Sequence, residues 1–145
     1  MIKEYLTKSE IETEDIGSQI ALLLDDNSFV ALYGEMGAGK TVFVRGIVKK
    51  LIPEAEHLVH SPTFALVNEY IGNNRTIYHF DMYRITSEDD LYSIGFDDYF
   101  NNGIIITEWS ENIESSIPST SIIVKIERIS NDKRRITVEE AKAIK

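Results

Sequence analysis

The chain has 145 residues, of which 24 are acidic and 15 basic, so its formal net charge is −9. This length is typical of one domain, and the acidic balance argues against a free-standing nucleic-acid binder, because phosphate backbones are bound by clustered lysine and arginine. The chain has no cysteine, which excludes disulfides and thiolate zinc sites, and no run of 18 or more apolar residues. We therefore expect a single domain over residues 1–145, in the cytoplasm and with no membrane contact.

The N-terminal part of the chain predicts a short strand followed by an amphipathic helix. Residues 2–7 are typical of a strand, and within residues 8–24 Ser9 and Glu12 have the spacing of a capping box. The apolar residues that would face the core at this helical spacing are Ile16, Ile20 and Leu24.

The stretch GEMGAGKT, residues 34–41, has the spacing G-x-x-x-x-G-K-T of a P-loop. In such a loop the backbone N–H groups wrap the phosphates of a nucleotide, the lysine reaches the terminal phosphates and the threonine hydroxyl binds Mg²⁺. The pattern therefore predicts a site for a nucleoside triphosphate with Mg²⁺. The loop residues expected to contact the nucleotide are Glu35, Met36, Gly37, Ala38, Gly39, Lys40 and Thr41.

The residues on either side of this loop supply the strand and the helix that a P-loop requires. The apolar run SFVALY before the loop is typical of a buried strand. After it, Phe43, Ile47 and Leu51 recur every four residues on one helical face, and Pro53 ends the helix.

The rest of the chain predicts further strands and short helices. Residues 61–70 and 75–85 read as two strands joined by a turn at IGNN, and residues 87–100 as one or two short helices. The run GIIIT predicts a central parallel strand, and residues 121–129 and 134–140 predict an antiparallel pair. The fold class expected is α/β, a single-domain P-loop NTPase fold with a mixed, mainly parallel central sheet flanked by helices.

Two acidic residues stand where a P-loop enzyme places its metal ligand or its water-orienting group. Glu108 follows GIIIT, and Asp81 follows the shorter apolar run IYHF. Either can hold the metal while the other orients the attacking water, and the sequence leaves this choice open. His79 and His60 lack the spaced partners that metal binding requires, so we interpret them as structural.

The sequence favours adenine over guanine as the base. The Asn-Lys-x-Asp tetrad of Ras-type GTPases does not occur in the chain. The aromatic residues Tyr33, Tyr83 and Trp109 lie near the expected site and could stack on a ligand or shield it. Trp109 adjoins Glu108, so its fluorescence is expected to report on the site.

Five motifs together resemble the bacterial TsaE (YjeE) family, the small ATPases of tRNA threonylcarbamoyladenosine biosynthesis. They are GEMGAGKTVFVRGI, SPTFALVNEY, YHFDMYRI, GFDDYF and ITEWSE, in the order and spacing of that family, over about residues 29–112. Two departures stand out. Val42 replaces the second threonine usual after the P-loop lysine, and Ser110 replaces a proline common in the EWPE form of the last motif.

The resemblance implies roles for individual residues. Gly37 to Thr41 cradle the phosphates, Thr41 and Glu108 hold Mg²⁺, and Asp81 is needed for hydrolysis. It also implies that Thr63 lies in a switch-like loop. The residues that it places on the adenosine side of the ligand are Ser9, Glu10 and Arg134.

The resemblance further implies an Mg²⁺-dependent ATPase that is weak alone and works with the proteins TsaD and TsaB, meeting tRNA only through that complex. That pair transfers a threonylcarbamoyl group to the adenosine beside the anticodon of tRNAs that read ANN codons. Two alternatives remain: a small-molecule P-loop kinase, which needs a lid rich in arginine, and a nucleotide-sensing adaptor that does not turn ATP over. Only Arg75 and Arg84 lie in the middle of the chain, and neither belongs to an arginine cluster.

Overall fold

The computed structural model describes residues 2–62 and 65–140. Its strands are β1 (Ile2–Thr7), β2 (Phe29–Tyr33), β3 (Val67–Gly72), β4 (Arg75–Asp81), β5 (Ile104–Glu108), β6 (Ile122–Arg128) and β7 (Arg134–Glu139). Its helices are α1 (Glu10–Ala21), α2 (Lys40–Leu51) and α3 (Glu88–Ser93), together with the 3-10 helices η1 (Pro53–Leu58), η2 (Phe96–Tyr99) and η3 (Ser110–Ser116).

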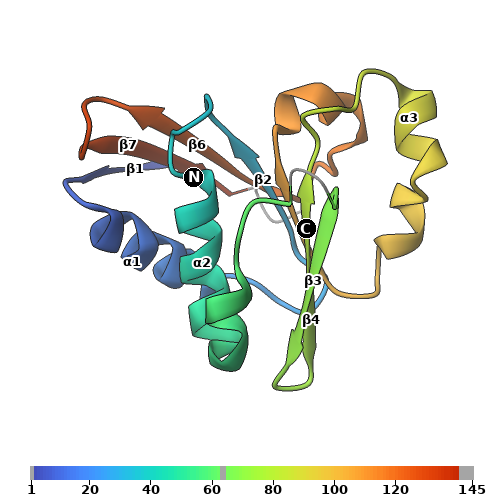
Figure 1. Ribbon diagram of the computed structural model, residues 1–145, viewed down its shortest axis with the longest axis horizontal. Coiled ribbons are helices and arrows are strands. Elements are labelled where there is room, and N and C mark those ends of the chain that lie inside the picture. The colour runs from blue at the N-terminus through green and yellow to red at the C-terminus, as the bar shows by residue number, and fades with distance from the viewer. Residues whose placement is uncertain (1, 63–64, 141–145) are drawn as a thin grey trace.

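Within the described residues, the strands form one seven-stranded sheet in the order β1-β7-β6-β2-β5-β4-β3, with helices on both faces (Figure 1). The four central strands β6, β2, β5 and β4 run parallel, and the strands outside them pair antiparallel. The α/β class and the mixed sheet with a parallel centre are therefore confirmed. No helix in the described part of the chain combines the length and the hydropathy needed to cross a bilayer.

Most predicted elements form, but three differ in extent. The strand expected over residues 75–85 ends at Asp81. The first helix ends at Ala21 instead of continuing to residue 24, and Leu24 packs against the core from the turn that follows. The strand expected over residues 61–70 begins only at Val67. Leu66 has a left-handed backbone (φ 71°) and donates its N–H to the Pro62 carbonyl, which interrupts the extended conformation.

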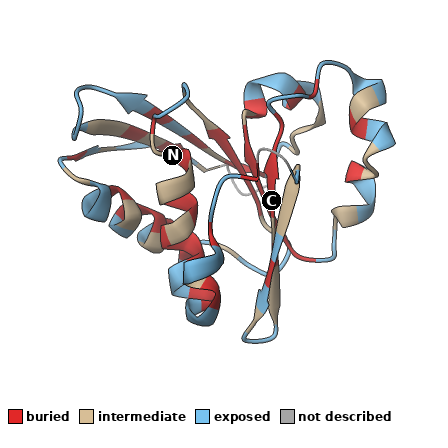
Figure 2. Cartoon of the chain, in the orientation of Figure 1, coloured by how far each residue is buried: buried red, intermediate tan, exposed pale blue. Residues whose placement is uncertain are grey.

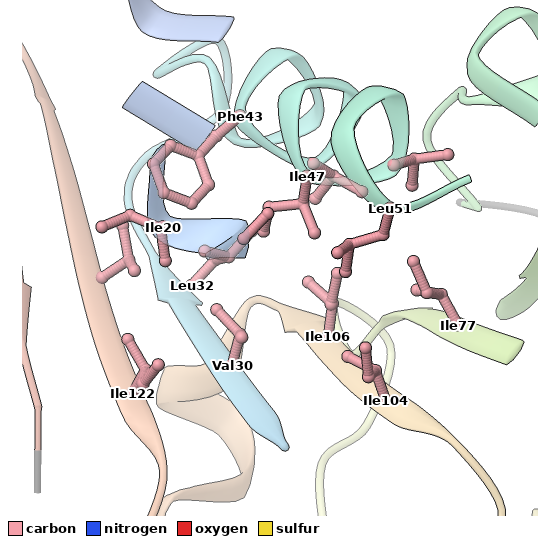
Figure 3. Close-up of a cluster of buried hydrophobic side chains, with 14 of the residues drawn as sticks. Ile20, Val30, Leu32, Phe43, Ile47, Leu51, Ile77, Ile104, Ile106 and Ile122 are labelled. Carbon is pink, nitrogen blue, oxygen red and sulfur yellow. The ribbon is translucent and has the colours of Figure 1, made fainter. Parts of the chain in front are cut away.

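The larger core lies between α2, α1 and one face of the sheet, as Figure 3 shows. Phe43, Ile47 and Leu51 of α2 point into it, as their spacing predicts. The two helices cross closely at Gly17 and Gly46. A methyl group at Gly46 would lie 1.9 Å from the Glu14 carbonyl oxygen, so only glycine permits this approach.

A second, aromatic-rich core covers the other face of the central strands beneath α3, η2 and η3 (Figures 1 and 2). Its rings stack or meet edge to face, and the centroids of Phe80 and Phe96 lie 5.2 Å apart. Burial on both faces explains why β2 and β5 are continuous apolar runs. The parallel pairing of β2, β5 and β4 places their carboxyl ends side by side, and the candidate site lies at these ends.

Candidate functional site

The loop after β2 adopts a conformation that only glycine reaches easily and ends at the start of α2. Gly37 and Gly39 have φ angles of 79° and 107°, and Gly39 caps α2 with no side-chain hydrogen bond to its first N–H groups. An N-terminus of this kind attracts anions, because its N–H groups point outward and the helix dipole is positive there. The geometry of the loop therefore suits a phosphate.

The Lys40 side chain folds back into this loop. It is buried, its Nζ donates to the Gly34 carbonyl at 2.5 Å, and Nζ lies 3.9 Å from the centroid of the Trp109 ring. Burial lowers the pKa of Lys40, while the nearby carboxylates Glu108, Glu111 and Asp81 oppose that shift. An ammonium with so little water around it gains strongly from a phosphate partner.

The two acidic candidates are neighbours in the sheet. Asp81 ends β4 and Glu108 ends β5, and the two residues are direct partners in the parallel register. The Thr41 hydroxyl donates to the Glu108 carboxylate, at 3.1 Å to Oε2. Asp81 is held by its Oδ1, which accepts the N–H of Tyr83 at 2.9 Å. The structure thus brings together the three groups that the sequence proposed for metal and water.

These groups fit Mg²⁺. Thr41 gives its only hydroxyl proton to Glu108, which leaves the oxygen lone pairs of Thr41 to a metal, and hydroxyl and carboxylate oxygens are the ligands that Mg²⁺ prefers. Among the residues that the structure describes, no three His, Cys, Asp or Glu side chains cluster as a metal site made of protein alone. That pattern agrees with Mg²⁺ bound by one or two side chains plus phosphates and water.

His79 is part of the site, although the sequence suggested only a structural role. It is completely buried, and its Nε2 lies 2.5 Å from Glu108 Oε2. The position of His79 explains this contact. His79 and Asp81 project from the same face of β4, and Asp81 is the direct partner of Glu108, so His79 lies diagonally across from Glu108 on that face. That alternation was the signal available in the sequence. His60, by contrast, is exposed.

A cavity of about 550 Å³ opens between these groups, a volume suited to a nucleotide. The predicted residues that line it are Ser9, Glu10, Met36, Gly37, Ala38, Gly39, Lys40, Thr41, Asp81, Glu108, Trp109 and Arg134. Tyr83, which the sequence suggested as an aromatic neighbour of the ligand, also lines it. Residues that line it and were not predicted are Thr13, Val42, Ser61, Asn131 and Asp132.

The remaining four expectations, for Glu35, Thr63, Tyr83 and Tyr33, have different outcomes. Glu35 belongs to the loop but does not line the cavity, and Thr63 lies outside the described residues. Tyr83 lies beside Trp109, with ring centroids 5.0 Å apart. Tyr33 lines a separate, smaller pocket beside Lys125, so the expectation that it lies at the site is wrong.

Arg134 joins the loop to the turn between β6 and β7. Its guanidinium donates to the carbonyl oxygens of Ala38 at 2.7 Å and Gly37 at 3.3 Å. It also donates to the carbonyls of Ser130 at 2.8 Å and Asn131 at 3.1 Å. Arg134 therefore lines the cavity mainly as a brace of the phosphate loop, which the sequence could not show because the two segments are 96 residues apart.

Comparisons with known proteins identify the family of the chain. The family model described as "Threonylcarbamoyl adenosine biosynthesis protein TsaE" matches residues 7–136. The chain is 39% identical to the tRNA threonylcarbamoyladenosine biosynthesis protein TsaE of Rickettsia conorii over 134 residues, 92% of this chain and 76% of the relative. It is 33% identical to the protein of the same name from Aquifex aeolicus, over 95% of this chain and 96% of the relative.

A solved structure is also similar to this chain. The crystal structure of YdiB from Bacillus subtilis aligns with a TM-score of 0.78 and 27% identity, over 98% of this chain and 87% of that chain. The chain belongs to the TsaE family of threonylcarbamoyladenosine biosynthesis proteins.

Proposed function

We propose that this chain is an Mg²⁺-dependent ATPase that serves tRNA threonylcarbamoyladenosine synthesis together with TsaD and TsaB. The observation that carries the proposal is the convergence of Lys40, Thr41, Asp81 and Glu108 on one cavity, with Thr41 hydrogen-bonded to Glu108. The names of the relatives support the pathway. We expect the chain to act in the cytoplasm, where it would meet tRNA through its partners.

Each side chain has a role that follows from its position. The backbone N–H groups of the loop and the Lys40 ammonium bind the phosphates and offset their charge. Thr41 and Glu108 would hold Mg²⁺, which when bound neutralises charge on the transferred phosphoryl group. Asp81 lies beside Glu108 with its carboxylate fixed by the Tyr83 N–H, so we assign to it the orientation of the attacking water.

The far end of the cavity would take the adenosine. Ser9 caps α1 and lines the cavity, as do Glu10, Asn131 and Asp132. These four residues carry acceptor oxygens, which suit the exocyclic amino group of adenine and the ribose hydroxyls. The acidic character of the chain agrees with indirect contact to tRNA, since the basic surface would belong to the partners.

The kinase alternative finds less support. Among the described residues that line the cavity, the arginine is Arg134, and its guanidinium is committed to backbone carbonyls. Arg75 begins β4, at the strand end opposite to Asp81. The chain therefore lacks, around its described cavity, the arginine lid that a phosphoryl acceptor would need.

Calorimetry and a phosphate-transfer assay test the proposal. Calorimetry should show ATP and ADP binding, tighter with Mg²⁺, and GTP binding more weakly. Incubation with ATP and a panel of small hydroxyl and carboxylate acceptors should give inorganic phosphate and no phosphorylated acceptor. A phosphorylated acceptor would establish the kinase alternative, and ATP binding with no phosphate release even beside TsaD and TsaB would establish the adaptor.

A further inference from the structure

A line of buried polar side chains runs from Glu108 into the β3–β4 hairpin. Glu108 Oε2 lies 2.5 Å from His79 Nε2, and His79 Nδ1 lies 3.0 Å from the Tyr70 hydroxyl. The Asn68 amide nitrogen lies 3.5 Å from the same hydroxyl and donates to the His60 carbonyl at 3.0 Å. The line therefore begins at a cavity wall and ends at an exposed residue.

Three residues of this line, Glu108, His79 and Tyr70, are too well buried for their contacts to be incidental. His79 has no exposed surface, Tyr70 is 2% exposed and Glu108 is 4% exposed. A buried imidazole and a buried hydroxyl each need hydrogen-bond partners, because an unpaired polar group costs about 1–3 kcal/mol. If positions 70 and 79 served only for packing, apolar side chains would stabilise the fold more, because they carry no polar group to bury.

The directions of these hydrogen bonds follow from what each group can donate. An ionised Glu108 carboxylate only accepts, so His79 carries a proton on Nε2 and donates it. In a neutral imidazole Nδ1 is then the acceptor, and the Tyr70 hydroxyl donates to it. Burial raises the pKa of Tyr70, which keeps the phenol protonated and able to donate. The Asn68 amide points its donor at the oxygen of that phenol.

We propose that His79 is a positioning residue that fixes the orientation of the Glu108 carboxylate, and that Tyr70 selects the His79 tautomer able to do so. The proposal rests on the proposed function, in which Glu108 holds Mg²⁺. His79 and Thr41 approach the same carboxylate from two elements, β4 and α2. Two donors from different directions fix its rotation, so the ligand oxygen is already oriented before a metal binds.

The first test needs neither nucleotide nor metal. Nitrogen-15 NMR of the imidazole rings distinguishes the tautomers, and the chain has only three histidines, so His79→Gln assigns the signal. We expect His79 to carry its proton on Nε2, with Nδ1 accepting a hydrogen bond. Tyr70→Phe should move the Nδ1 resonance toward that of an imidazole nitrogen without a donor. A proton on Nδ1, alone or together with one on Nε2, overturns the assignment.

The second test measures how strongly Mg²⁺ tightens nucleotide binding, as the ratio of ATP affinities in Mg²⁺ and in EDTA. His79→Leu removes the donor and keeps an apolar volume, and we expect this ratio to fall about 10- to 100-fold. His79→Gln restores an N–H donor and should recover most of the ratio. The affinity in EDTA should not change in either variant.

Tyr70→Phe should also lower the ratio of ATP affinities in Mg²⁺ and in EDTA, but by less than His79→Leu does. Its matched control is Tyr78→Phe, which removes a hydroxyl from the other face of the same hairpin, where the ring packs against Tyr99. This control should leave the ratio unchanged. If His79→Leu does not fold, as judged by thermal denaturation, the two tyrosine variants decide, and equal ratios for them overturn the proposal.

The remaining outcomes separate this proposal from the proposed function. A wild-type protein that binds ATP equally well with Mg²⁺ and with EDTA contradicts the proposed function itself. A wild-type protein that needs Mg²⁺, with His79→Leu unchanged, overturns only the role of His79. Equal losses in His79→Leu and His79→Gln also overturn it, because they would indicate packing instead of a donor.

Discussion

The ammonium of Lys40 lies against the indole of Trp109, with Nζ 3.9 Å from the ring centroid. A cation over an aromatic face is attracted by the ring quadrupole, and more strongly where water is excluded. The same Nζ also donates to the Gly34 carbonyl. Lys40 is thus held between the phosphate loop and Trp109, the residue that follows Glu108.

This contact makes Trp109 a reporter of phosphate binding. A phosphate that pairs with Lys40 changes the charge and the water around the indole, so Trp109 fluorescence should change in intensity and wavelength on addition of ATP or ADP. The chain has one tryptophan, so the signal has a single source. A flat fluorescence titration, with binding confirmed by calorimetry, would contradict the role given to Trp109.

Lys40→Ala should weaken ATP binding strongly. The substitution removes a charge-assisted contact to phosphate of about 1.5–3 kcal/mol, which corresponds to roughly 10- to 150-fold in affinity. Isothermal calorimetry measures the change. Lys49→Ala is the matched control, because Lys49 lies on the same helix and pairs with Glu14 at the surface. Equal affinities for the wild type and Lys40→Ala would contradict the P-loop assignment.

Glu108→Gln and Asp81→Asn should separate metal binding from water orientation. Loss of a charged oxygen ligand at Glu108 should lower the apparent affinity for Mg²⁺ together with turnover, while nucleotide binding in EDTA survives. Asp81→Asn should leave Mg²⁺-ATP binding nearly intact and reduce turnover steeply, as for a group that acts in the transition state. The measurements are Mg²⁺-dependent ATP affinity and single-turnover hydrolysis. The reverse pattern would exchange the two roles.

Arg134→Gln should loosen the phosphate loop. The substitution removes the guanidinium donors to Ala38 and Gly37, so we expect weaker ATP binding and a lower melting temperature. Arg135→Gln is a matched control, since Arg135 is the next residue and pairs with Glu4 and Glu127 at the surface. Exposed ion pairs contribute about 0–1 kcal/mol, so the control should change little. Equal ATP affinities in both variants would argue against the brace.

Gly46→Ala should destabilise the fold even though alanine is the better helix former. The gain in helix propensity is about 1 kcal/mol, but the new methyl group would lie 1.9 Å from the Glu14 carbonyl oxygen and force α1 and α2 apart. Overpacking of this kind costs about 1–3 kcal/mol, more where backbone must move. Urea denaturation measures the change, with Ile11→Ala on the exposed side of α1 as the control. A more stable Gly46→Ala would contradict the close crossing.

The sequence predicts the elements of this fold well because their signals are local. The loop glycines, the apolar run of β5 and the four-residue spacing in α2 each depend only on neighbouring residues. The pairing of β1 with β7 is different, since Ile2 faces Glu139 across almost the whole chain. No local pattern encodes that contact.

The candidate site shows the same division. Lys40 and Thr41 belong to one contiguous motif, and Glu108 ends a clear strand, so all three were predictable. The roles of His79 and Arg134 depend on contacts 29 and 96 residues away in the chain, which only the folded structure brings together. Leu66 interrupts a strand by a backbone conformation that its side chain does not reveal.

Phosphate release from ATP tests the central claim most directly. It should be slow with the chain alone and faster when TsaD and TsaB are both added, and it should require Mg²⁺. Glu108→Gln and Asp81→Asn should each suppress the faster rate in the same mixture, which excludes a contaminating ATPase. Release that stays at the background rate in every mixture, or that persists in both variants, would contradict the account.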